Sequence, residues 1–339
     1  MIRVGVIGCG YWGTNLLRNF AEGASCGLAA ASDLVAERLA VAKRRYPGVK
    51  AAADAAALIE DPAIDAVAIA TPVSTHYELA LRALQAGKHV LVEKPLAAKS
   101  EEGKHLVEEA ERRGLTLMVD HTFLYTDSVR LIRELIHGGE LGELYYYDSV
   151  RINLGLFQHD VNVVWDLAAH DLSILEYVVP QRIRAVSATG LTHVPGSPED
   201  IAYLTLHYDD SLIGHLHVNW LAPVKIRRTV IGGSRRMVVY DELEPSEKVK
   251  IYDRGITVEE GSEEAYQLLI GYRAGDMLAP QIGLTEALKG VVSEFARCIE
   301  TGARPRTGGP EGLRVVRLLE AAGRSMANKG APIEVPDEG

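Results

Sequence analysis

Cysteine is scarce in this sequence, which has only three among its 339 residues: Cys9, Cys26 and Cys298. An odd number without a paired spacing excludes a disulfide framework and a cysteine-rich zinc site, so we expect reduced thiols and no metal. No stretch approaches the ~20 consecutive apolar residues of a membrane helix. The chain also opens without the basic and apolar regions of a signal peptide. We therefore expect a cytoplasmic protein without a membrane partner.

Positive charge is in deficit. Lysine and arginine number 36 against 46 aspartates and glutamates, which gives a formal net charge of −10. An acidic surface repels a polyphosphate backbone, so no nucleic-acid partner is expected and a small-molecule ligand is favoured. The composition, 47 % hydrophobic and 24 % charged, is that of an ordinary globular protein, and the length predicts about two domains.

The first third of the sequence alternates short apolar runs with helical segments. Residues 74–86 and 100–113 have apolar positions at three- and four-residue spacing, between strand-like runs. This alternation predicts βαβ units and hence a doubly wound parallel sheet, a Rossmann-like α/β domain over residues 1–122. The expected strands are residues 3–7, 28–32, 66–71, 89–93 and 115–120.

After residue 122, strand patterns follow one another. Asp209-Asp210 and Gly232-Gly233 are typical hairpin connectors. We expect residues 123–339 to form an α/β domain with a large, mainly antiparallel open sheet, covered by helices on one face. The other face lacks an obvious cover, which favours a homodimer or homotetramer formed through the sheet. The expected strands are residues 144–154, 183–188, 201–208, 211–220, 225–231, 236–241, 248–252 and 332–335.

Helices are expected between and after these strands. The last two are candidates to pack back on the first domain. Residues 259–285 are less periodic, and we expect a loop or short helical pieces there. The expected helices are residues 128–137, 162–179, 286–300 and 310–328.

A glycine-rich segment follows the first expected strand directly and opens a helix. In this context Gly8 suits a tight turn, Gly10 a close approach of a pyrophosphate to the backbone, and Gly13 close helix packing. The free N–H groups at the start of that helix would receive the pyrophosphate. We expect a dinucleotide cofactor lined by this segment, Gly8-Cys9-Gly10-Tyr11-Trp12-Gly13, with Tyr11 and Trp12 among its contacts.

Asp33 lies twenty residues after Gly13, at the end of the second expected strand. A carboxylate there accepts hydrogen bonds from the adenosine ribose and repels a 2′-phosphate, so NAD is favoured over NADP. Ser32 and Arg38 could still accommodate a phosphate. An alternative is that Asp33 only caps the following helix.

Polar residues follow three later strands of the expected parallel sheet. They are Thr71-Pro72 with His76, then Glu93-Lys94-Pro95, and Asp120-His121. Ligands of open parallel sheets bind outside the carboxyl ends of the strands, so these residues should line the cofactor site. Lys94 would be partly desolvated beside the cofactor. The alternative is a lysine at the rim of the site with no role.

An otherwise apolar helical segment carries Asp166 and His170 at i and i+4, on one face. A carboxylate one turn before an imidazole can fix its tautomer and raise its basicity, as a general base near neutral pH requires. A surface Asp/His pair is the alternative. His215 and His217 share a strand face, but no third ligand has a recognisable spacing, so a metal is not expected there.

Together these motifs resemble the glucose-fructose oxidoreductase and inositol dehydrogenase family. The resemblance rests on the glycine loop, Thr71-Pro72 with His76, Glu93-Lys94-Pro95-Leu96, and the Asp166/His170 pair, in this order along nearly the whole chain. It implies reversible hydride transfer between nicotinamide and a sugar or cyclitol hydroxyl carbon. It also implies catalytic roles for Lys94, Asp166 and His170, and a cis bond before Pro95.

A narrower resemblance concerns Arg151-Ile152-Asn153 and Asn162-Val163-Val164-Trp165. This part looks like the branch that acts on nucleotide-linked sugars at C-3, such as UDP-N-acetylglucosaminuronate 3-dehydrogenases. It implies a sugar or nucleotide-sugar site formed by His121, Arg151, Asn153, Asn162, Trp165 and His170. A free inositol or monosaccharide dehydrogenase is the alternative enzyme, and a non-catalytic NAD-binding regulator is the alternative of another class. The sequence leaves open whether Lys94 or His170 is the base.

Overall fold

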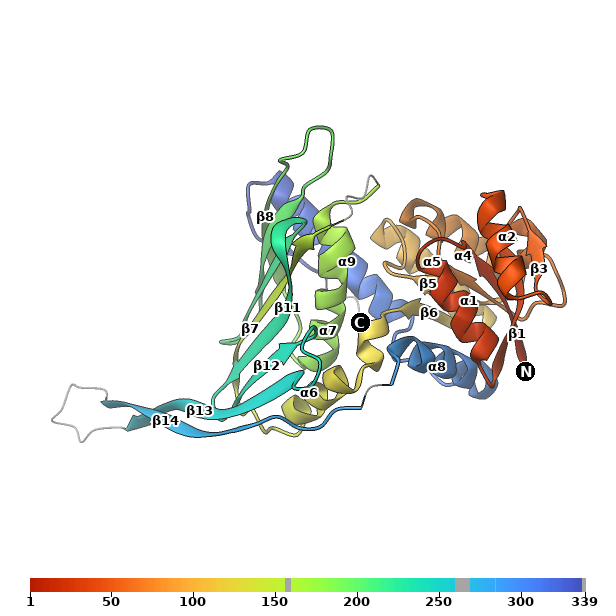
Figure 1. Ribbon diagram of the computed structural model, residues 1–339. Coiled ribbons are helices and arrows are strands. Elements are labelled where there is room, and N and C mark those ends of the chain that lie inside the picture. Colours follow the sequence, from red (N-terminus) through yellow and green to blue (C-terminus); the bar gives the residue numbers. More distant parts are fainter. Residues whose placement is uncertain (156–159, 260–268, 284, 337–339) are drawn as a thin grey trace. The chain divides into compact units, whose positions relative to one another are not determined.

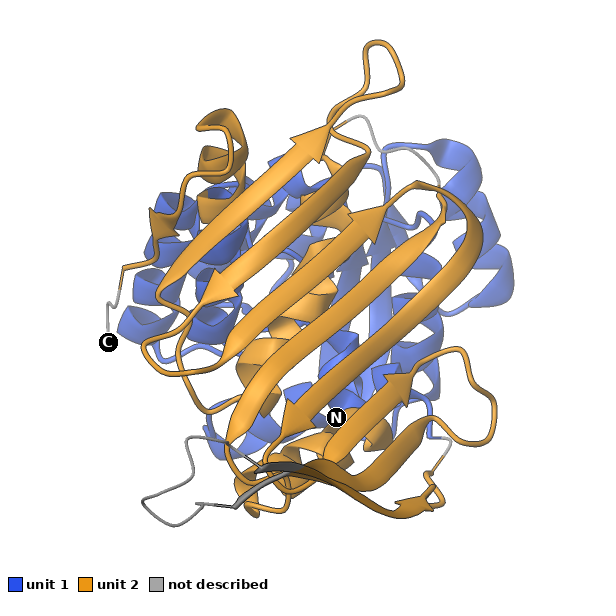
Figure 2. Ribbon diagram, turned by 90° about the vertical axis from the view of Figure 1, so that its left-hand side faces the viewer, with its two compact units in different colours: residues 1–126, 285–320 blue, residues 127–284, 321–339 orange. Residues whose placement is uncertain are grey.

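A computed structural model describes residues 1–155, 160–259, 269–283 and 285–336 of the chain (Figure 1). The chain divides into two compact units, which Figure 2 shows in different colours. Unit 1 contains residues 1–126 and 285–320, and unit 2 contains residues 127–284 and 321–339. Within the described residues, no helix is long and apolar enough to cross a membrane.

Unit 1 contains the expected parallel sheet. Its order is β3-β2-β1-β4-β5-β6, and all of its strand pairs are parallel. The strands are β1 (Ile2–Ile7), β2 (Cys26–Ser32), β3 (Lys50–Ala52), β4 (Ala66–Ile69), β5 (His89–Glu93) and β6 (Leu117–Asp120). Burial along β4 is continuous, as expected for a strand covered on both faces. The doubly wound fold is therefore confirmed.

Helices connect these strands, and two later segments complete unit 1. The helices are α1 (Gly13–Glu22), α2 (Ala36–Arg45), α3 (Ala56–Ile59), α4 (His76–Gln85) and α5 (Ser100–Arg113), with the 3-10 turns η1 (Val73–Thr75) and η2 (Thr122–Tyr125). The helix α8 (Ala287–Thr301) and the first part of α9 (Gly309–Ala327) also belong to unit 1. Gly114 ends α5 in the left-handed conformation, at φ 65°, which glycine adopts without steric cost.

Unit 2 is built on a nine-stranded sheet of order β14-β13-β12-β11-β7-β10-β9-β8-β15. Only the β7 and β10 pair is parallel among the described pairs, so the expected mainly antiparallel sheet is confirmed. The strands are β7 (Leu144–Leu154), β8 (Ala185–Leu191), β9 (Ile201–His207), β10 (Ile213–Asn219), β11 (Leu221–Gly233), β12 (Met237–Asp241), β13 (Val249–Glu259), β14 (Leu269–Leu278) and β15 (Ile333–Glu334).

One face of this sheet is packed and the other is bare. Burial alternates residue by residue along β9 and β10, the pattern of a sheet with one solvated face. In Figure 2 the helices in the described part of unit 2 lie behind the sheet, and none of them covers the side facing the viewer. They include α6 (Asp127–His137) and α7 (Ala169–Val178), which is preceded by one π-helical turn, η3 (Val164–Ala168).

The expected loop at residues 259–285 is wrong over residues 269–278, which form β14, whereas residues 279–283 and 285 lie outside helices and strands as expected. β14 forms an antiparallel pair with β13, with Ile251 opposite Leu278 and Ile256 opposite Tyr272. This hairpin gains its stability from cross-strand pairs, which no local periodicity displays. Residues 260–268 of the expected loop lie outside the described residues.

Candidate active site

The glycine loop has the geometry of a ligand cradle. Gly8 has φ 94°, and a Cβ atom on it would lie 2.5 Å from the carbonyl oxygen of Ala70. A Cβ atom on Gly13 would lie 1.9 Å from the carbonyl oxygen of Gly8, so only glycine fits at either place. A Cβ atom on Gly10 would meet nothing closer than Nη1 of Arg38, at 3.7 Å. The loop therefore leaves its backbone open at the position expected to receive a pyrophosphate.

Asp33 is fixed behind this loop. One carboxylate oxygen accepts the backbone N–H of Cys9 at 2.7 Å, and the other accepts that of Val35 at 2.8 Å. Residue 35, not Asp33, is the N-cap of α2, so Asp33 shapes the turn that precedes the helix. Each carboxylate oxygen retains a second lone pair for a ribose hydroxyl. Nη1 of Arg38 lies 3.8 Å from the same carboxylate.

His76 joins two segments that follow strands of the parallel sheet. Its ring nitrogens lie 2.9 Å from the carbonyl oxygens of Thr71 and Pro95, and the residue is 1 % exposed. The imidazole thus holds the Thr71-Pro72 turn close to the segment after β5. The Lys94–Pro95 peptide bond is cis, as the family resemblance implies.

Two carboxyl groups are neighbours at the carboxyl ends of β5 and β6. Glu93 is the register partner of Asp120 in this parallel pair. Burial raises the pKa of Glu93 well above its ordinary value, and the Asp120 charge adds to the rise. Burial also raises the pKa of Asp120.

His121 follows Asp120 and is almost completely buried, at 2 % exposed. Burial, assisted by the charge of Lys94, lowers the pKa of His121 to about 3. The ring is therefore neutral at physiological pH. Neither ring nitrogen has a hydrogen-bond partner among the described residues.

In unit 2, Asp166 lies in the π-helical turn η3 and His170 lies in the first turn of α7. A carboxylate oxygen of Asp166 accepts the indole N–H of Trp220 at 3.1 Å. The backbone N–H of Asp166 also bonds to the carbonyl oxygen of Asn162 at 3.1 Å. Single π turns inside helices are frequent at functional sites. The expected continuous helix over residues 162–179 thus contains a widened turn at Asp166.

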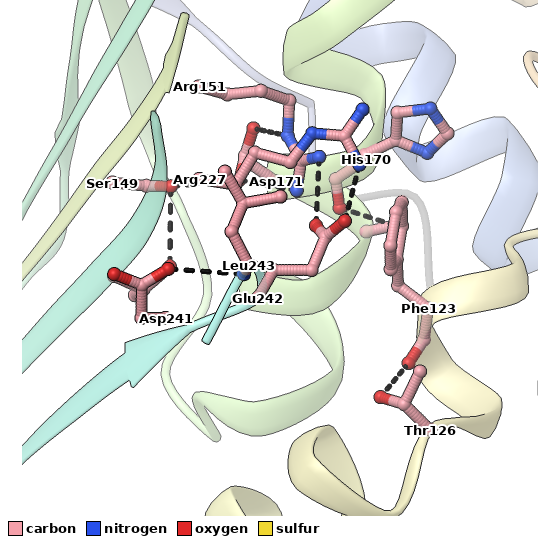
Figure 3. Close-up of polar contacts among 12 residues, drawn as sticks. Phe123, Thr126, Ser149, Arg151, His170, Asp171, Arg227, Asp241, Glu242 and Leu243 are labelled. Atoms are coloured by element: carbon pink, nitrogen blue, oxygen red, sulfur yellow. Dashed lines mark hydrogen bonds and ion pairs between the residues drawn. The ribbon is translucent and has the colours of Figure 1, made fainter. Parts of the chain in front are cut away.

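Arg151 lies in a buried ion network and not at an open surface. Its side chain is 4 % exposed, and Nε donates to Asp171 at 2.7 Å while Nη1 donates to Glu242 at 3.1 Å (Figure 3). Ser149 donates to Asp171 at 2.8 Å. Burial opposes the charge of Arg151, but the two carboxylates outweigh it and raise its pKa. The network fixes α7, which carries His170, against β7.

Asn162, Asn153 and Trp165, which are also expected to bind the substrate, lie outside the ion network of Arg151. Asn162 accepts the backbone N–H of Trp165 at 3.1 Å and donates to Glu199 at 3.0 Å, so its amide organises the start of η3. Asn153 and Trp165 are half-buried. Part of each of these two side chains is therefore accessible to a ligand.

Three residues of these surroundings have no role that the sequence alone indicates: Trp220, Asp171 and Glu242. Asp171 directly follows His170. A charged residue directly before the mostly apolar run Leu172-Ser173-Ile174-Leu175 is the available signal for Asp171. Trp220 and Glu242 carry no such local signal, because their partners are distant in the sequence.

Comparison with known proteins agrees with the fold. Residues 2–121 match the model of an oxidoreductase family with an NAD-binding Rossmann fold, and residues 129–239 match the model of the same family's C-terminal domain. The chain is 25 % identical to myo-inositol 2-dehydrogenase of Thermotoga maritima over 97 % of each chain. It is 29 % identical to UDP-N-acetylglucosamine 3-dehydrogenase of Acidithiobacillus ferrooxidans, over 83 % of this chain and 86 % of the relative.

Solved structures show the same architecture. That of UDP-N-acetylglucosamine 3-dehydrogenase from Acidithiobacillus ferrooxidans superimposes with a TM-score of 0.78 at 26 % identity, covering 96 % of this chain and 97 % of that one. A levoglucosan dehydrogenase in complex with NADH and levoglucosan gives a TM-score of 0.82 at 22 % identity, covering 99 % of this chain and 100 % of that one. The second likeness concerns the fold alone.

Proposed function

Because the chain belongs to the Gfo/Idh/MocA oxidoreductase family with an NAD-binding Rossmann fold, we propose that it is a sugar dehydrogenase acting on a CH–OH group. The observation that carries this proposal is the glycine cradle. Its positions 8 and 13 exclude any Cβ atom, and Asp33 is fixed behind it. Such a loop between a strand and a helix suits the pyrophosphate of a dinucleotide.

NAD is the cofactor that the residues present fit. The cradle would receive the pyrophosphate and Asp33 the adenosine ribose, while Glu93 offers a buried oxygen without a hydrogen-bond partner among the described residues. Bound NAD supplies a hydride acceptor. The Asp33 charge disfavours a 2′-phosphate, although Arg38 beside it tempers this preference.

Lys94, Asp166 and His170 are the proposed catalytic residues. His170 would accept the hydroxyl proton of the sugar, and Asp166 would orient its ring. Lys94 would hold the hydroxyl oxygen and stabilise the negative charge that develops on it. The bond from Trp220 supports this assignment, because it holds the Asp166 carboxylate in one position.

A nucleotide-linked sugar oxidised or reduced at C-3, such as UDP-N-acetylglucosaminuronate, is the proposed substrate. Support comes from the 29 % identical relative, a UDP-N-acetylglucosamine 3-dehydrogenase. Asn153, Trp165 and His121 are the proposed contacts. Arg151 and Asn162 are proposed to act on substrate through the elements that they fix, because Asp171, Glu242 and Glu199 occupy their polar groups.

A free inositol is the second candidate substrate, because myo-inositol 2-dehydrogenase matches 97 % of this chain. A nucleotide sugar carries a diphosphate that an inositol lacks, so the two candidates predict different substrate ranges. A regulator that binds NAD without catalysis would turn over neither.

A homo-oligomer is proposed to form through the bare face of the large sheet. Tyr203 is 44 % exposed on β9 and Ile213 is 50 % exposed on β10, and the register of these paired strands places both side chains on the same face of the sheet. Exposed large apolar side chains on adjacent strands are typical of an interface. The oligomeric state at micromolar protein, measured by light scattering, tests this proposal.

The substrate proposal is tested by mixing the protein with NAD and each candidate and following the near-ultraviolet absorbance of NADH. We expect absorbance to rise with UDP-N-acetylglucosaminuronate and to remain flat with free inositols. His170→Asn should abolish the signal. The control His105→Asn, at an exposed position of α5, should retain it. If only inositols are turned over, a free inositol replaces the nucleotide sugar as the proposed substrate. If NAD binds but no candidate is turned over, a non-catalytic regulator is favoured.

A further inference from the structure

Asp120 at the end of β6 connects two parts of the cofactor unit. Its side chain is buried, with the residue 1 % exposed. One carboxylate oxygen accepts the indole N–H of Trp12 at 2.8 Å, and the other accepts the hydroxyl of Thr122 at 2.6 Å. Trp12 belongs to the glycine loop, 108 residues earlier in the sequence. A bond from an N–H to a carboxylate is among the stronger hydrogen bonds in proteins.

Asp120 also lies beside Glu93, its register partner on β5. Two buried carboxyl groups in contact cannot both ionise without strong repulsion, so such a pair retains one proton between them. The raised pKa of each carboxyl agrees with this arrangement. The charge of Lys94, after β5, acts on both carboxyl groups and also on His121, and the Asp120 charge acts on Tyr125 in η2.

Glu93 and His121, the residue after Asp120, carry buried polar atoms without hydrogen-bond partners in the described chain. Oε2 of Glu93 and both ring nitrogens of His121 have no hydrogen-bond partner within the part of the chain that the structure describes. Leaving such atoms unpaired is costly in a protein interior. These atoms are available at this end of the sheet to a polar ligand or to water.

We propose that Asp120 is a positioning residue for hydride transfer, which holds Glu93 and, through Trp12, ties the end of β6 to the glycine loop. This inference rests on the proposed function. Cofactor binding at the loop then depends on the same carboxylate that fixes Glu93 beside Lys94. The carboxylate of Asp120 bonds to the side chain of Trp12 and lies beside Glu93, so we place its effect on the reaction in these two residues.

The link from the loop is tested with Trp12→Phe, which keeps an aromatic ring and removes the indole N–H. Because this N–H joins the glycine loop to Asp120, its loss predicts about tenfold or greater weakening of NAD binding, measured by titration, together with a lower kcat. Thr122→Val is the matched control. It removes one hydrogen bond to the same carboxylate and leaves the Trp12 contact and the charge, so its effect should stay within about threefold.

The charge of the pair is tested with Asp120→Asn, which is nearly isosteric. Without its acidic neighbour, Glu93 should ionise at lower pH. The part of the kcat/KM pH profile that depends on ionisation of the pair should therefore move to lower pH. The protein has three tryptophans, so its NMR spectrum should contain three indole N–H resonances. The resonance that is missing from the spectrum of Trp12→Phe is that of Trp12. This resonance should shift in the apo Asp120→Asn protein.

The proposal is overturned if Trp12→Phe leaves the Kd for NAD and kcat within about twofold of the unmodified protein. An unchanged pH profile and an unmoved Trp12 resonance in Asp120→Asn would overturn it as well. NAD titration and the indole resonance need no sugar. They therefore decide the role of Asp120 even if the sugar dehydrogenase assignment fails, and that failure would appear separately as the absence of turnover.

Discussion

Trp220 donates its indole N–H to the carboxylate of Asp166 at 3.1 Å, from a side chain that is only 1 % exposed. The carboxylate proposed to orient His170 is thus itself oriented by a buried donor. A hydrogen bond to an ionised carboxylate contributes about 1.5–3 kcal/mol. The bond from Trp220 to Asp166 is thus the first of the two positioning contacts that the proposed role of His170 requires.

The first prediction concerns this pair. Trp220→Phe should lower kcat about tenfold and leave the Kd for NAD unchanged, because it removes the donor to Asp166. In an Asp166→Asn background the same change should add little, since both residues act through His170. Steady-state kinetics of the two single variants and the double variant measure this coupling. Independent, additive losses would show that Trp220 contributes packing alone.

A second prediction concerns cofactor choice. Asp33→Ala should weaken NAD far more than NADP, because it removes a ribose acceptor and also the repulsion of a 2′-phosphate. Both affinities should fall somewhat, since the bonds to Cys9 and Val35 disappear as well. Arg38→Ala, the control, should weaken NADP more than NAD. Titration of each variant with NAD and with NADP gives the comparison. Equal losses of NAD and NADP affinity in Asp33→Ala would mean that Asp33 only supports the loop.

The glycine cradle supplies a third prediction. A methyl group at Gly13 would lie 1.9 Å from the Gly8 carbonyl oxygen, so Gly13→Ala must displace the loop. Overpacking of this kind costs about 1–3 kcal/mol, and NAD binding should weaken about tenfold or more. Gly48→Ala is the control, because nothing lies within 4 Å of its Cβ position. Near-normal NAD affinity in Gly13→Ala would contradict the assignment of this loop to the cofactor.

A fourth prediction follows from the pKa of His121, which burial lowers to about 3. The unfolded chain takes up a proton at this residue near pH 6.5, whereas the folded protein does not, so acid favours unfolding. His121 should make the protein about 2 kcal/mol less stable at pH 5 than at pH 7. In His121→Gln this part of the loss should disappear, as measured by urea unfolding at both pH values. An equal loss in both proteins would mean that His121 is charged or exposed.

The glycine loop, Asp33 and the parallel sheet can be predicted from the sequence because their signals are local. Gly8 and Gly13 stand between a strand and a helix, and that context defines them. Continuous apolar runs and helical spacing likewise define the Rossmann fold. These features need no knowledge of distant partners.

Features that depend on distant partners cannot be predicted in the same way. The contacts of Trp12 with Asp120 and of Trp220 with Asp166 span 108 and 54 residues. A strand arginine such as Arg151 can serve a ligand or an ion pair equally well, and only the folded positions of Asp171 and Glu242 distinguish the two. The β13–β14 hairpin escapes prediction for the same reason, because its stability comes from cross-strand pairs.

Hydride transfer from a sugar carbon is the central claim, and deuterium transfer tests it most directly. The protein is incubated with NAD and UDP-N-acetylglucosaminuronate carrying deuterium at C-3, and the reduced cofactor is analysed by mass spectrometry. The account predicts NADH that contains the deuterium, formed by the unmodified protein and not by His170→Asn. Reduced cofactor without deuterium would contradict transfer from C-3, and no reduced cofactor from any nucleotide sugar or inositol would contradict the dehydrogenase itself.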